Sequence, residues 1–394
     1  MTRIKKLLAL TAASCGLIAA APPGVWTPAW TASMFRAPNK EQEVAVDNAT
    51  VSFQIRVHAP GERLRLKLSN EFGQAVHIGA ATVRVTGGKA VPVTFGGKSA
   101  VRLDANGALT TDAAKLGVKA FDIVEVSLYL PEAARLTTIH GSAGTKTVIS
   151  SVGDHTKAPF EAVSKSNSRP LLASIEVLGK AARPVIVAYG DSITDNVGCA
   201  LDAVPVCRWG DMLQRRLTQA GKPHVVVTQA ISGNRVISRG TGPSGVERFD
   251  RDVLQTPGVT HLIILEGVND IGGSGRVRGD GTVAPTLSYD ELIAGYQSII
   301  TRAKAKGIKV IGLTILPYRG AGYHTEAGEA MRQRVNNWIL TSGQFDAAFD
   351  LAKVMGDPGD PTRLNPAYQR GDNLHPDGRG ETVMGEAIPL DLFK

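Results

Sequence analysis

The chain has few cysteines, few aromatic residues and, after its N-terminus, no long hydrophobic run. It contains 3 cysteines among 394 residues, and aromatic side chains make up 5% of the sequence. Without a second apolar run we expect no stable membrane insertion. The formal net charge of +8 comes from scattered lysines and arginines, so a nucleic-acid partner is not expected.

What the chain does have is typical of a folded, loop-rich protein. Hydrophobic residues make up 43% and charged residues 20%, which excludes a disordered chain and predicts a full-sized core. The 43 glycines indicate many turns and loops. At this length two domains are the default expectation.

Residues 1–21 have the pattern of a secretory signal peptide. Basic residues at positions 3, 5 and 6 precede an apolar stretch from Leu7 to Ala21 that is too short to span a bilayer. Cleavage is expected near its end, although Pro22 makes the bond after Ala21 a poor site. A lipoprotein at Cys15 is the alternative, but the usual leucine three residues upstream is missing. We expect export, to the periplasm or the extracellular space.

Removal of the signal leaves Cys199 and Cys207. They close a short loop in an oxidising compartment, so a disulfide is expected; two free buried thiols are the alternative. We do not expect a metal site at these two cysteines, because no further cysteine or histidine ligands lie nearby in the sequence. The histidines elsewhere share no ligand spacing, so we expect no metal and no cofactor.

Residues 22–180 are predicted to form a β-rich module that ends in a linker. Turn signals such as Gly87-Gly88 and Asn106-Gly107 separate segments in which apolar and polar residues alternate. The expected strands are 51–57, 64–68, 82–85, 91–95, 121–130 and 146–149. A β-sandwich or jelly-roll-like module follows from this pattern, with residues 152–180 as the link.

Residues 181–394 alternate between strand and helix patterns. Strands are expected at 185–189, 225–228, 262–265, 310–315 and 347–350. Between them, helical spacing is found near residues 209–217, 246–254, 292–303 and 335–339, and Gly307 is a candidate helix C-cap. This alternation predicts a parallel sheet covered by helices.

Four short motifs follow successive elements of this second region. They are Gly190-Asp191-Ser192, Ile231-Ser232-Gly233-Asn234-Arg235, Glu266-Gly267-Val268-Asn269-Asp270 and Asp372-Asn373-Leu374-His375-Pro376. Parallel strands bring their carboxyl ends to one edge of a sheet, so the first three motifs should meet there. Considered without the other motifs, Ser192 is better explained as a helix N-cap than as a nucleophile.

Together the four motifs resemble the blocks of the SGNH (GDSL) hydrolases, a family of serine esterases and lipases. The resemblance covers roughly residues 183–390 and implies a three-layer, flavodoxin-like parallel sheet with helices on both faces. The N-terminal region is similar to a β-module of an exported group of these esterases, most clearly at Leu68-Ser69-Asn70-Glu71-Phe72-Gly73. Upstream, Trp26 and Trp30 are interpreted as packing residues.

Ester hydrolysis through an acyl-enzyme needs a hydroxyl nucleophile, a base and a group that orients the base. Ser192, His375 and Asp372 supply these groups, and the resemblance implies the same assignment. It also implies that the backbone N–H groups of Ser192 and Gly233 and the side chain of Asn269 form the oxyanion hole. We expect structural roles for Asp191 and Asp270.

Two questions stay open at this level. Asp377 competes with Asp372 as the partner of His375, although the motif favours Asp372. Residues 271–288 are polar and rich in glycine, with Arg276, Arg278 and Asp280, and form either a rim or lid over the site or a solvated loop.

The polar composition of that segment favours short-chain acyl or acetyl esters, of small molecules or of polysaccharides. A longer-chain lipase or phospholipase is the alternative within the same class. A polysaccharide-binding protein with a vestigial esterase domain is the alternative from another class. In a further alternative, the β-module recognises the substrate while the second domain catalyses. The oligomeric state does not follow from the sequence.

Overall fold

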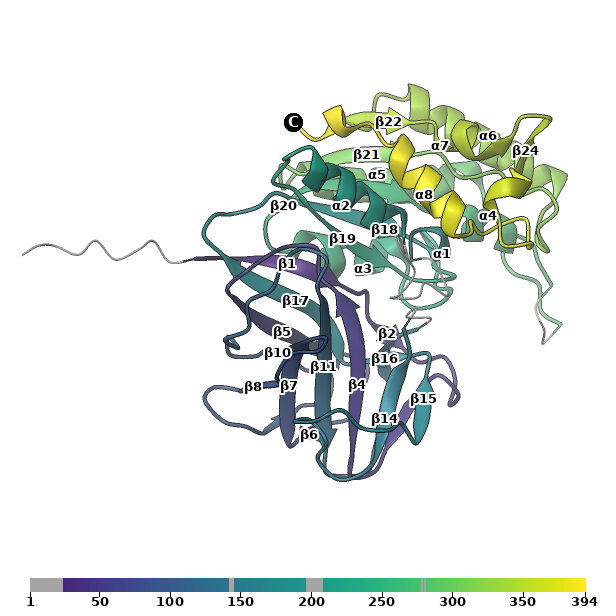
Figure 1. Ribbon diagram of the computed structural model, residues 1–394. Coiled ribbons are helices and arrows are strands. Elements are labelled where there is room, and N and C mark those ends of the chain that lie inside the picture. Colours follow the sequence, from purple (N-terminus) through teal and green to yellow (C-terminus); the bar gives the residue numbers. More distant parts are fainter. Residues whose placement is uncertain (1–23, 142–144, 196–207, 278, 280) are drawn as a thin grey trace, which may run out of the picture.

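The computed structural model describes residues 24–141, 145–195, 208–277, 279 and 281–394. The expected signal peptide and the expected Cys199–Cys207 disulfide lie outside the described residues. The chain forms two lobes, one made of strands and one made of a sheet with helices (Figure 1). In the described part of the chain, no helix combines the length and the apolar character needed to cross a membrane.

The first lobe is built mostly of antiparallel strands. Its four-stranded sheet has the order β1 (Val25–Thr31), β17 (Leu172–Gly179), β5 (Arg63–Ser69) and β10 (Ala108–Thr110). Its six-stranded sheet has the order β15 (Ser164–Ser166), β14 (Thr147–Val152), β4 (Ala49–Arg56), β11 (Ile123–Leu130), β7 (Ala80–Val85) and β8 (Val91–Val93). Alternate residues of β4 and β5 are buried in one core, which is the pattern that predicted these strands.

The assignment of residues 152–180 to a linker was wrong for its last part. Strand β17 lies inside the four-stranded sheet and pairs with β1 on one side and β5 on the other. Its buried residues include Ser174 and Glu176 as well as apolar residues, because both faces of much of the strand are covered. The linker between the lobes is therefore only the short segment between Gly179 and Val185.

Several strands of the first lobe were not predicted, because they are too short to show a period. A three-stranded sheet has the order β16 (Arg169–Pro170), β13 (Thr138–His140) and β2 (Phe35–Arg36). The pairs β3 (Val44–Val46) with β12 (Ala134–Leu136) and β6 (Val76–Ile78) with β9 (Val101–Leu103) complete the lobe. Strand β1 carries both early tryptophans, and Trp30 packs in the core as expected.

The second lobe contains a five-stranded parallel sheet. Its order is β19 (Val225–Ala230), β18 (Val185–Gly190), β20 (Val259–Leu265), β21 (Lys309–Leu313) and β22 (Ala347–Phe349). Numbered along the chain this is 2-1-3-4-5, the expected flavodoxin-like order, and its topological switch point lies between β18 and β20. All residues of β18 and β19 are buried, as continuous apolar runs predict.

Helices cover the sheet in two groups. Helices α2 (Trp209–Gln219), α7 (Leu351–Met355) and α8 (Gly378–Ala387) pack together, as do α3 (Gly245–Phe249), α5 (Tyr289–Lys304) and α6 (Glu326–Thr341) (Figure 1). The helix predicted at 246–254 is α3 followed by a π-helical turn, η1 (Asp250–Leu254). Helix α5 ends three residues before Gly307, whose positive φ of 71° continues the turn after it.

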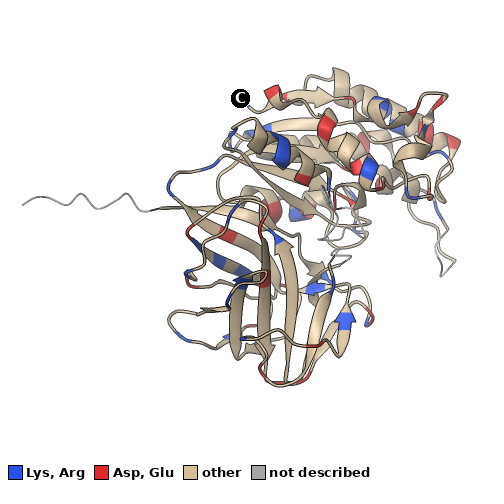
Figure 2. Ribbon diagram, viewed as in Figure 1, with Lys and Arg blue, Asp and Glu red and all other residues tan. Residues whose placement is uncertain are grey.

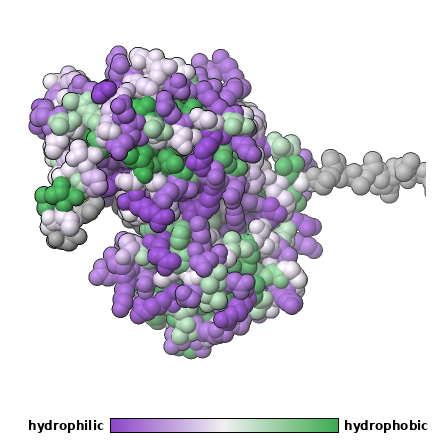
Figure 3. Space-filling view, turned by 180° about the vertical axis from the view of Figure 1, so that it is seen from behind, coloured by the Kyte–Doolittle hydropathy of each residue, from purple (hydrophilic) through white to green (hydrophobic). Residues whose placement is uncertain are grey.

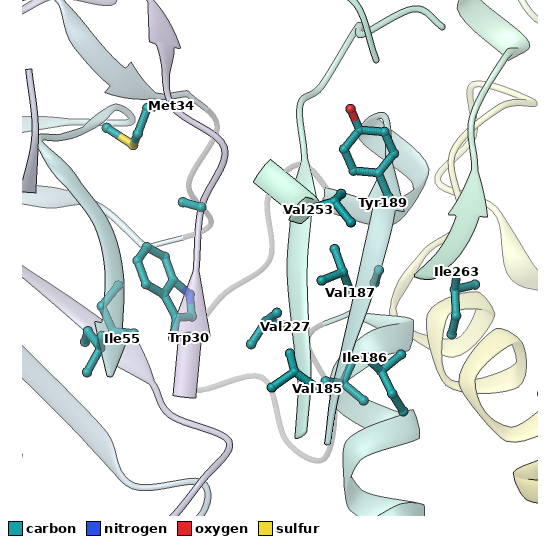
Figure 4. Packing of buried hydrophobic residues seen from close by; sticks show 14 of the residues in the cluster. Trp30, Met34, Ile55, Val185, Ile186, Val187, Tyr189, Val227, Val253 and Ile263 are labelled. Atoms are coloured by element: carbon teal, nitrogen blue, oxygen red, sulfur yellow. The ribbon is translucent and has the colours of Figure 1, made fainter. Parts of the chain in front are cut away.

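The two lobes share one core. Trp30, Met34 and Ile55 of the first lobe lie across from Val227 and Val187 of the parallel sheet in Figure 4, and all five belong to one buried cluster. Charged residues of both signs are interspersed over both lobes in Figure 2, and hydrophilic residues dominate the rear surface in Figure 3. Buried hydrophobic residues of both lobes make up the shared core.

Candidate active site

Ser192 lies where the central strand β18 ends. It is the first residue of a short helical turn, α1 (Ser192–Asp195), and is 4% exposed. Asp191 shapes this turn: its Oδ1 accepts the N–H of Ile193, and its carbonyl accepts the N–H of Thr194 and of Asp195. Asp191 has the structural contacts expected of it, and Ser192 is placed at the carboxyl edge of the sheet.

Gly190 makes the close approach of this turn to the neighbouring strand possible. A Cβ atom at this position would collide with the carbonyl oxygen of Leu265, in β20, and with the side chain of Thr194. Any larger residue would push β18 away from β20 at the switch point of the sheet. The glycine of the first motif is therefore required by packing.

His375 of the C-terminal motif reaches Ser192, and Asp372 of the same motif contacts His375. The Nε2 atom of His375 lies 2.8 Å from Ser192 Oγ, and the Nδ1 atom of His375 lies 2.7 Å from Asp372 Oδ2. If Nδ1–H donates to the carboxylate, Nε2 is left to accept the hydroxyl proton of Ser192. The three side chains predicted from the first and last motifs, in which Ser192 and His375 are 183 residues apart, thus form one hydrogen-bonded chain.

The loop that contains Asp372 holds its carboxylate in place. Asp372 Oδ1 accepts the backbone N–H groups of Leu374 and His375, at 3.0 and 2.8 Å. Asn373 between them has a positive φ of 58°, which asparagine tolerates better than most residues. Burial raises the pKa of Asp372, but the hydrogen bonds from His375 and Leu374 outweigh burial and lower it below 3.8.

Asp377 is not the partner of His375. Its Oδ1 accepts the backbone N–H of Gly380 and so caps the first turn of α8. The competition left open by the sequence is decided by this hydrogen bond, because a carboxylate that caps α8 points away from the Nδ1 atom that Asp372 contacts.

Gly233 and Asn269 lie in two loops that contact each other. Gly233 has a positive φ of 78°, and a Cβ there would lie 2.7 Å from Thr241 Oγ1. Asn269, in α4 (Val268–Gly273), donates from Nδ2 to the carbonyl oxygen of Asn234 over 3.0 Å. One amide hydrogen of Asn269 remains for another acceptor.

Both residues line a pocket of about 310 Å³ beside the sheet edge. Its other lining residues are Arg235, Gly272, Gly273, Arg276, Val277, Gly279, Ala284 and Tyr323. The Tyr323 hydroxyl approaches Asn269 Oδ1 at 3.4 Å. Burial raises the pKa of Tyr323 above its ordinary value of 10.0, so this hydroxyl is a neutral donor.

The segment 271–288 is only partly a loop. Ile271, Gly272 and Gly273 belong to α4, and Leu287 and Ser288 lead into α5, where Ser288 is the N-cap. Between them the chain projects from the lobe, and its two arms are joined by a bridge between Val277 and Val283 (Figure 1). The segment therefore contributes a rim to the pocket through Arg276, Val277, Gly279 and Ala284.

Three carboxyl groups are buried beneath the motifs. Burial raises the pKa of Asp191 to about 7, of Glu266 to about 8 and of Asp270 to about 6. Asp270 accepts the backbone N–H groups of Val236 and Ile237, the structural role that was expected of it. Asp191 and Asp270 also raise the pKa of Glu266, and Asp270 raises that of Asp191, so full ionisation of the cluster is unfavourable.

Arg248, which the sequence did not single out, connects the segments that carry the motifs. Its guanidinium is fully buried and donates to Gly190 O over 2.9 Å and to Asn234 Oδ1 over 2.8 Å. It also lies 3.7 Å from Glu266 and 3.2 Å from Asp252. One side chain thus contacts the loops of the first three motifs.

The sequence pattern that could have identified Glu266 and Arg248 is a charged residue next to a run of apolar residues. Glu266 follows the apolar strand β20 directly, and Arg248 lies among the apolar residues of α3. Neither pattern predicts which residue the charged side chain contacts, because these contacts join residues far apart in the sequence. Among the residues that the structure describes, no group of three or more His, Cys, Asp or Glu side chains is arranged to hold a metal ion.

A serine, a histidine and an aspartate hydrogen-bonded in series at the carboxyl edge of a parallel sheet are typical of serine hydrolases. Residues 188–383 match the sequence model of the GDSL-like lipase/acylhydrolase family. This part of the chain is a GDSL-like lipase/acylhydrolase domain with the SGNH hydrolase fold, and the members of this family are esterases and lipases.

Solved structures of this kind match about half of the chain. A putative acylhydrolase from Bacteroides fragilis has 22% identity, with 52% of this chain and 87% of that chain covered and a TM-score of 0.38. A GDSL-like lipase from Bacteroides thetaiotaomicron has 22% identity, with 53% and 89% covered and a TM-score of 0.39. An acetylxylan esterase from Geobacillus stearothermophilus has 21% identity, with 52% and 93% covered and a TM-score of 0.38. No curated protein matches the chain.

Proposed function

We propose that the chain is an exported serine esterase that acts through an acyl-enzyme. The observation that carries this proposal is the hydrogen-bonded series Ser192–His375–Asp372, with contacts of 2.8 and 2.7 Å. In the first half-reaction Ser192 Oγ attacks the ester carbonyl carbon while His375 Nε2 takes the hydroxyl proton. His375 then returns this proton to the departing alcohol.

The second half-reaction reverses these roles. Water gives a proton to His375 Nε2 and attacks the acyl-serine, and His375 then returns this proton to Ser192 Oγ as the tetrahedral species releases the free acid. Asp372 keeps the imidazole in the reactive tautomer and stabilises the imidazolium that forms twice in each cycle. The carboxylate can do this over a wide pH range because its pKa is lowered.

The oxyanion of each tetrahedral species needs hydrogen-bond donors. We assign this role to the backbone N–H groups of Ser192 and Gly233 and to Nδ2 of Asn269. The positive φ of Gly233 and the hydrogen bond from Asn269 to Asn234 support the assignment, because they fix two of these donors beside one pocket. Removal of one such donor typically lowers the rate about 10²–10³-fold.

The preferred substrates are esters of short acyl groups, including acetyl esters of carbohydrates. Glycines, two arginines and a tyrosine predominate in the 310 Å³ pocket that contains Asn269 and Gly233, which favours small and polar groups over a long alkyl chain. The alternative is a lipase or phospholipase for longer chains.

A series of p-nitrophenyl esters from acetyl to decanoyl separates these two functions. We expect kcat/KM to be highest for acetyl to butyryl esters and to fall for longer chains. A steady rise toward the decanoyl ester would identify a lipase. Release of acetate from acetylated xylan, measured beside the p-nitrophenyl series, tests the carbohydrate substrates.

The mechanism itself is tested by Ser192→Ala. We expect loss of p-nitrophenyl acetate hydrolysis and of labelling by a fluorophosphonate probe, with an unchanged melting temperature. A conservative control is Ser274→Ala, whose hydroxyl accepts the backbone N–H of Leu287 in the rim segment. Full activity in Ser192→Ala would refute the acyl-enzyme. An unlabelled, inactive wild-type protein would favour the polysaccharide-binding protein with a vestigial esterase domain.

Export and the two-module division complete the proposal. The signal peptide at residues 1–21 directs the mature protein to the periplasm or beyond, and the module at 22–180 precedes the catalytic domain at 181–394. The β-module is proposed to be a sandwich with jelly-roll-like connections, and Cys199 and Cys207 to form a disulfide. Mass spectrometry of the secreted protein, before and after reduction, tests the cleavage and the disulfide together.

A further inference from the structure

The β-module reaches the turn that carries Ser192. The reacting serine is the first residue of α1, and Asp195 is the last. Asp195 is 5% exposed, and its Oδ1 lies 3.2 Å from Nε2 of His140, in strand β13 of the β-module. His140 is 4% exposed, so this contact is shielded from water.

His140 is fixed from its other side as well. Its Nδ1 lies 3.1 Å from the carbonyl oxygen of Ser33, which follows β1. Both ring nitrogens of His140 therefore face oxygen atoms that can accept a hydrogen bond. Arg208 Nη1 lies 4.0 Å from the same carboxyl oxygen, so a second side chain approaches Asp195 here.

The same segment of the β-module also reaches the start of the turn. Ser33 is fully buried, and its Oγ accepts a hydrogen bond of 3.2 Å from Arg248. Arg248 in turn donates to the carbonyl oxygen of Gly190, two residues before Ser192. Contacts from the β-module thus lie at both ends of the nucleophile turn, one through Arg248 and one through His140.

We propose that His140 is a positioning residue for Ser192, and that the β-module is for this reason a structural part of the active site. The inference rests on the proposed function of Ser192 as nucleophile. Helix α1 is a single four-residue turn, too short to be stable by its own hydrogen bonds, so its geometry depends on contacts from outside. His140 does not touch the reacting atoms; it acts through Asp195.

The chain contains a matched control for this role. His58 of the β-module is 6% exposed, and its Nδ1 lies 2.7 Å from the carbonyl oxygen of Val226. Its Nε2 lies 3.0 Å from Asp211, in α2. His58 therefore makes the same kind of contact across the same interface, with a helix that carries no residue of the proposed mechanism.

The test compares His140→Ala with His58→Ala in the full-length protein. Both variants should lose a similar amount of melting temperature, because each loses a buried contact between lobes. Only His140→Ala should also lower kcat for p-nitrophenyl acetate, by about 10- to 100-fold with KM within about twofold, because a small displacement of a reacting group costs rate rather than binding. The rate of fluorophosphonate labelling should fall with kcat, and His140→Gln, which keeps one donor, should recover part of both.

A wild-type kcat in folded His140→Ala would overturn the inference, and so would an equal loss of kcat in His58→Ala. If His140→Ala does not fold, Asp195→Asn decides: the same loss of kcat supports the inference, and wild-type kcat overturns it. Ser192→Ala, measured alongside, separates the two proposals. Activity that survives Ser192→Ala contradicts the proposed function itself, whereas an inactive Ser192→Ala with a fully active His140→Ala contradicts only the positioning role.

Discussion

Three buried acidic side chains lie beneath Ser192, but only one buried guanidinium, that of Arg248, is described beside them. Asp191, Glu266 and Asp270 all have raised pKa values, and Arg248 is the cation closest to Glu266. Both carboxyl oxygens of Glu266 are buried without a hydrogen-bond partner among the described residues. A buried carboxylate without donors is costly when ionised, so the protonated form is favoured in the folded protein.

This arrangement predicts that stability falls as the pH rises. The folded protein holds the proton of Glu266 up to a pKa of about 8, whereas the unfolded chain releases it near the ordinary value of 4.5. The stabilising effect is complete below the ordinary pKa and is lost as the pH rises through the folded pKa. Glu266→Gln should therefore flatten the dependence of melting temperature on pH between about 5 and 8.

The dependence of melting temperature on pH is measured by thermal unfolding in buffers of different pH. Asp191, with its own raised pKa of about 7, leaves part of the slope in the Glu266→Gln variant. Glu62→Gln is the control, since the Glu62 side chain is 74% exposed. Equal slopes for the wild type and Glu266→Gln would contradict this prediction.

Arg248 is expected to affect the rate as well as stability. Arg248→Lys keeps a positive charge but cannot make all the hydrogen bonds to Gly190, Asn234 and Ser33 at once, because a lysine ammonium lacks the planar fork. We expect kcat to fall about 10- to 100-fold with a smaller change in KM.

Steady-state kinetics and melting temperatures of Arg248→Lys and Arg302→Lys provide the comparison. Arg302 donates to the carbonyl oxygen of Val246 in the same helix, α3, but contacts none of the motif loops. A lower melting temperature with unchanged kcat in Arg248→Lys would assign Arg248 a purely structural role.

At the scale of elements, the C-terminal loop and the start of helix α8 each contain one aspartate, and the two aspartates have different roles. Asp372 binds His375, and Asp377 caps α8. The two residues lie on either side of the histidine, so sequence distance alone does not separate them. The direction in which α8 begins does, because its first N–H groups need an acceptor.

Substitutions of Asp372 and Asp377 test these two roles. Asp372→Asn should lower kcat about 10²–10⁴-fold because the imidazole loses its orienting carboxylate, with little change in stability. Asp377→Ala should instead lower the free energy of unfolding by about 1 kcal/mol and leave kcat/KM within about twofold. Chemical denaturation and p-nitrophenyl acetate kinetics measure both effects. The opposite pattern would exchange the two roles.

For the whole molecule, the interface between the lobes closes the edge of the parallel sheet. Strand β19 lies at that edge, and two of its carbonyl oxygens have side-chain partners from the β-module. Thr31 Oγ1 donates to the carbonyl of Thr228 over 2.8 Å, and His58 contacts that of Val226 over 2.7 Å. An uncovered strand edge is a site of aggregation, and here the β-module covers it.

A chain that starts at residue 181 should therefore fold poorly. Removal of the β-module would expose buried residues such as Val227 and leave the carbonyls of β19 without their partners. We expect aggregation, or a much lower melting temperature, in size-exclusion chromatography and thermal unfolding compared with a chain that starts at residue 22. A monomeric, stable and fully active fragment would show that the β-module is dispensable.

Much of the fold was predictable because it is encoded locally. The buried run of β18, the alternation of β4 and β5 and the position of each motif after a strand are patterns within a few residues. Strand β17 escaped the prediction because it buries the polar residues Ser174 and Glu176 together with its apolar residues. The short strands β13 and β16 escaped it because two or three residues carry no period.

The sequence by itself determined the parallel sheet and the motif residues Ser192 and His375, because strand periodicity and motif order are local properties of the chain. Only the tertiary structure decided what surrounds them. The contact of His140 with Asp195 spans 55 positions and that of Ser33 with Arg248 spans 215. Such contacts depend on how the two lobes pack, and no local pattern records which buried donor meets which acceptor.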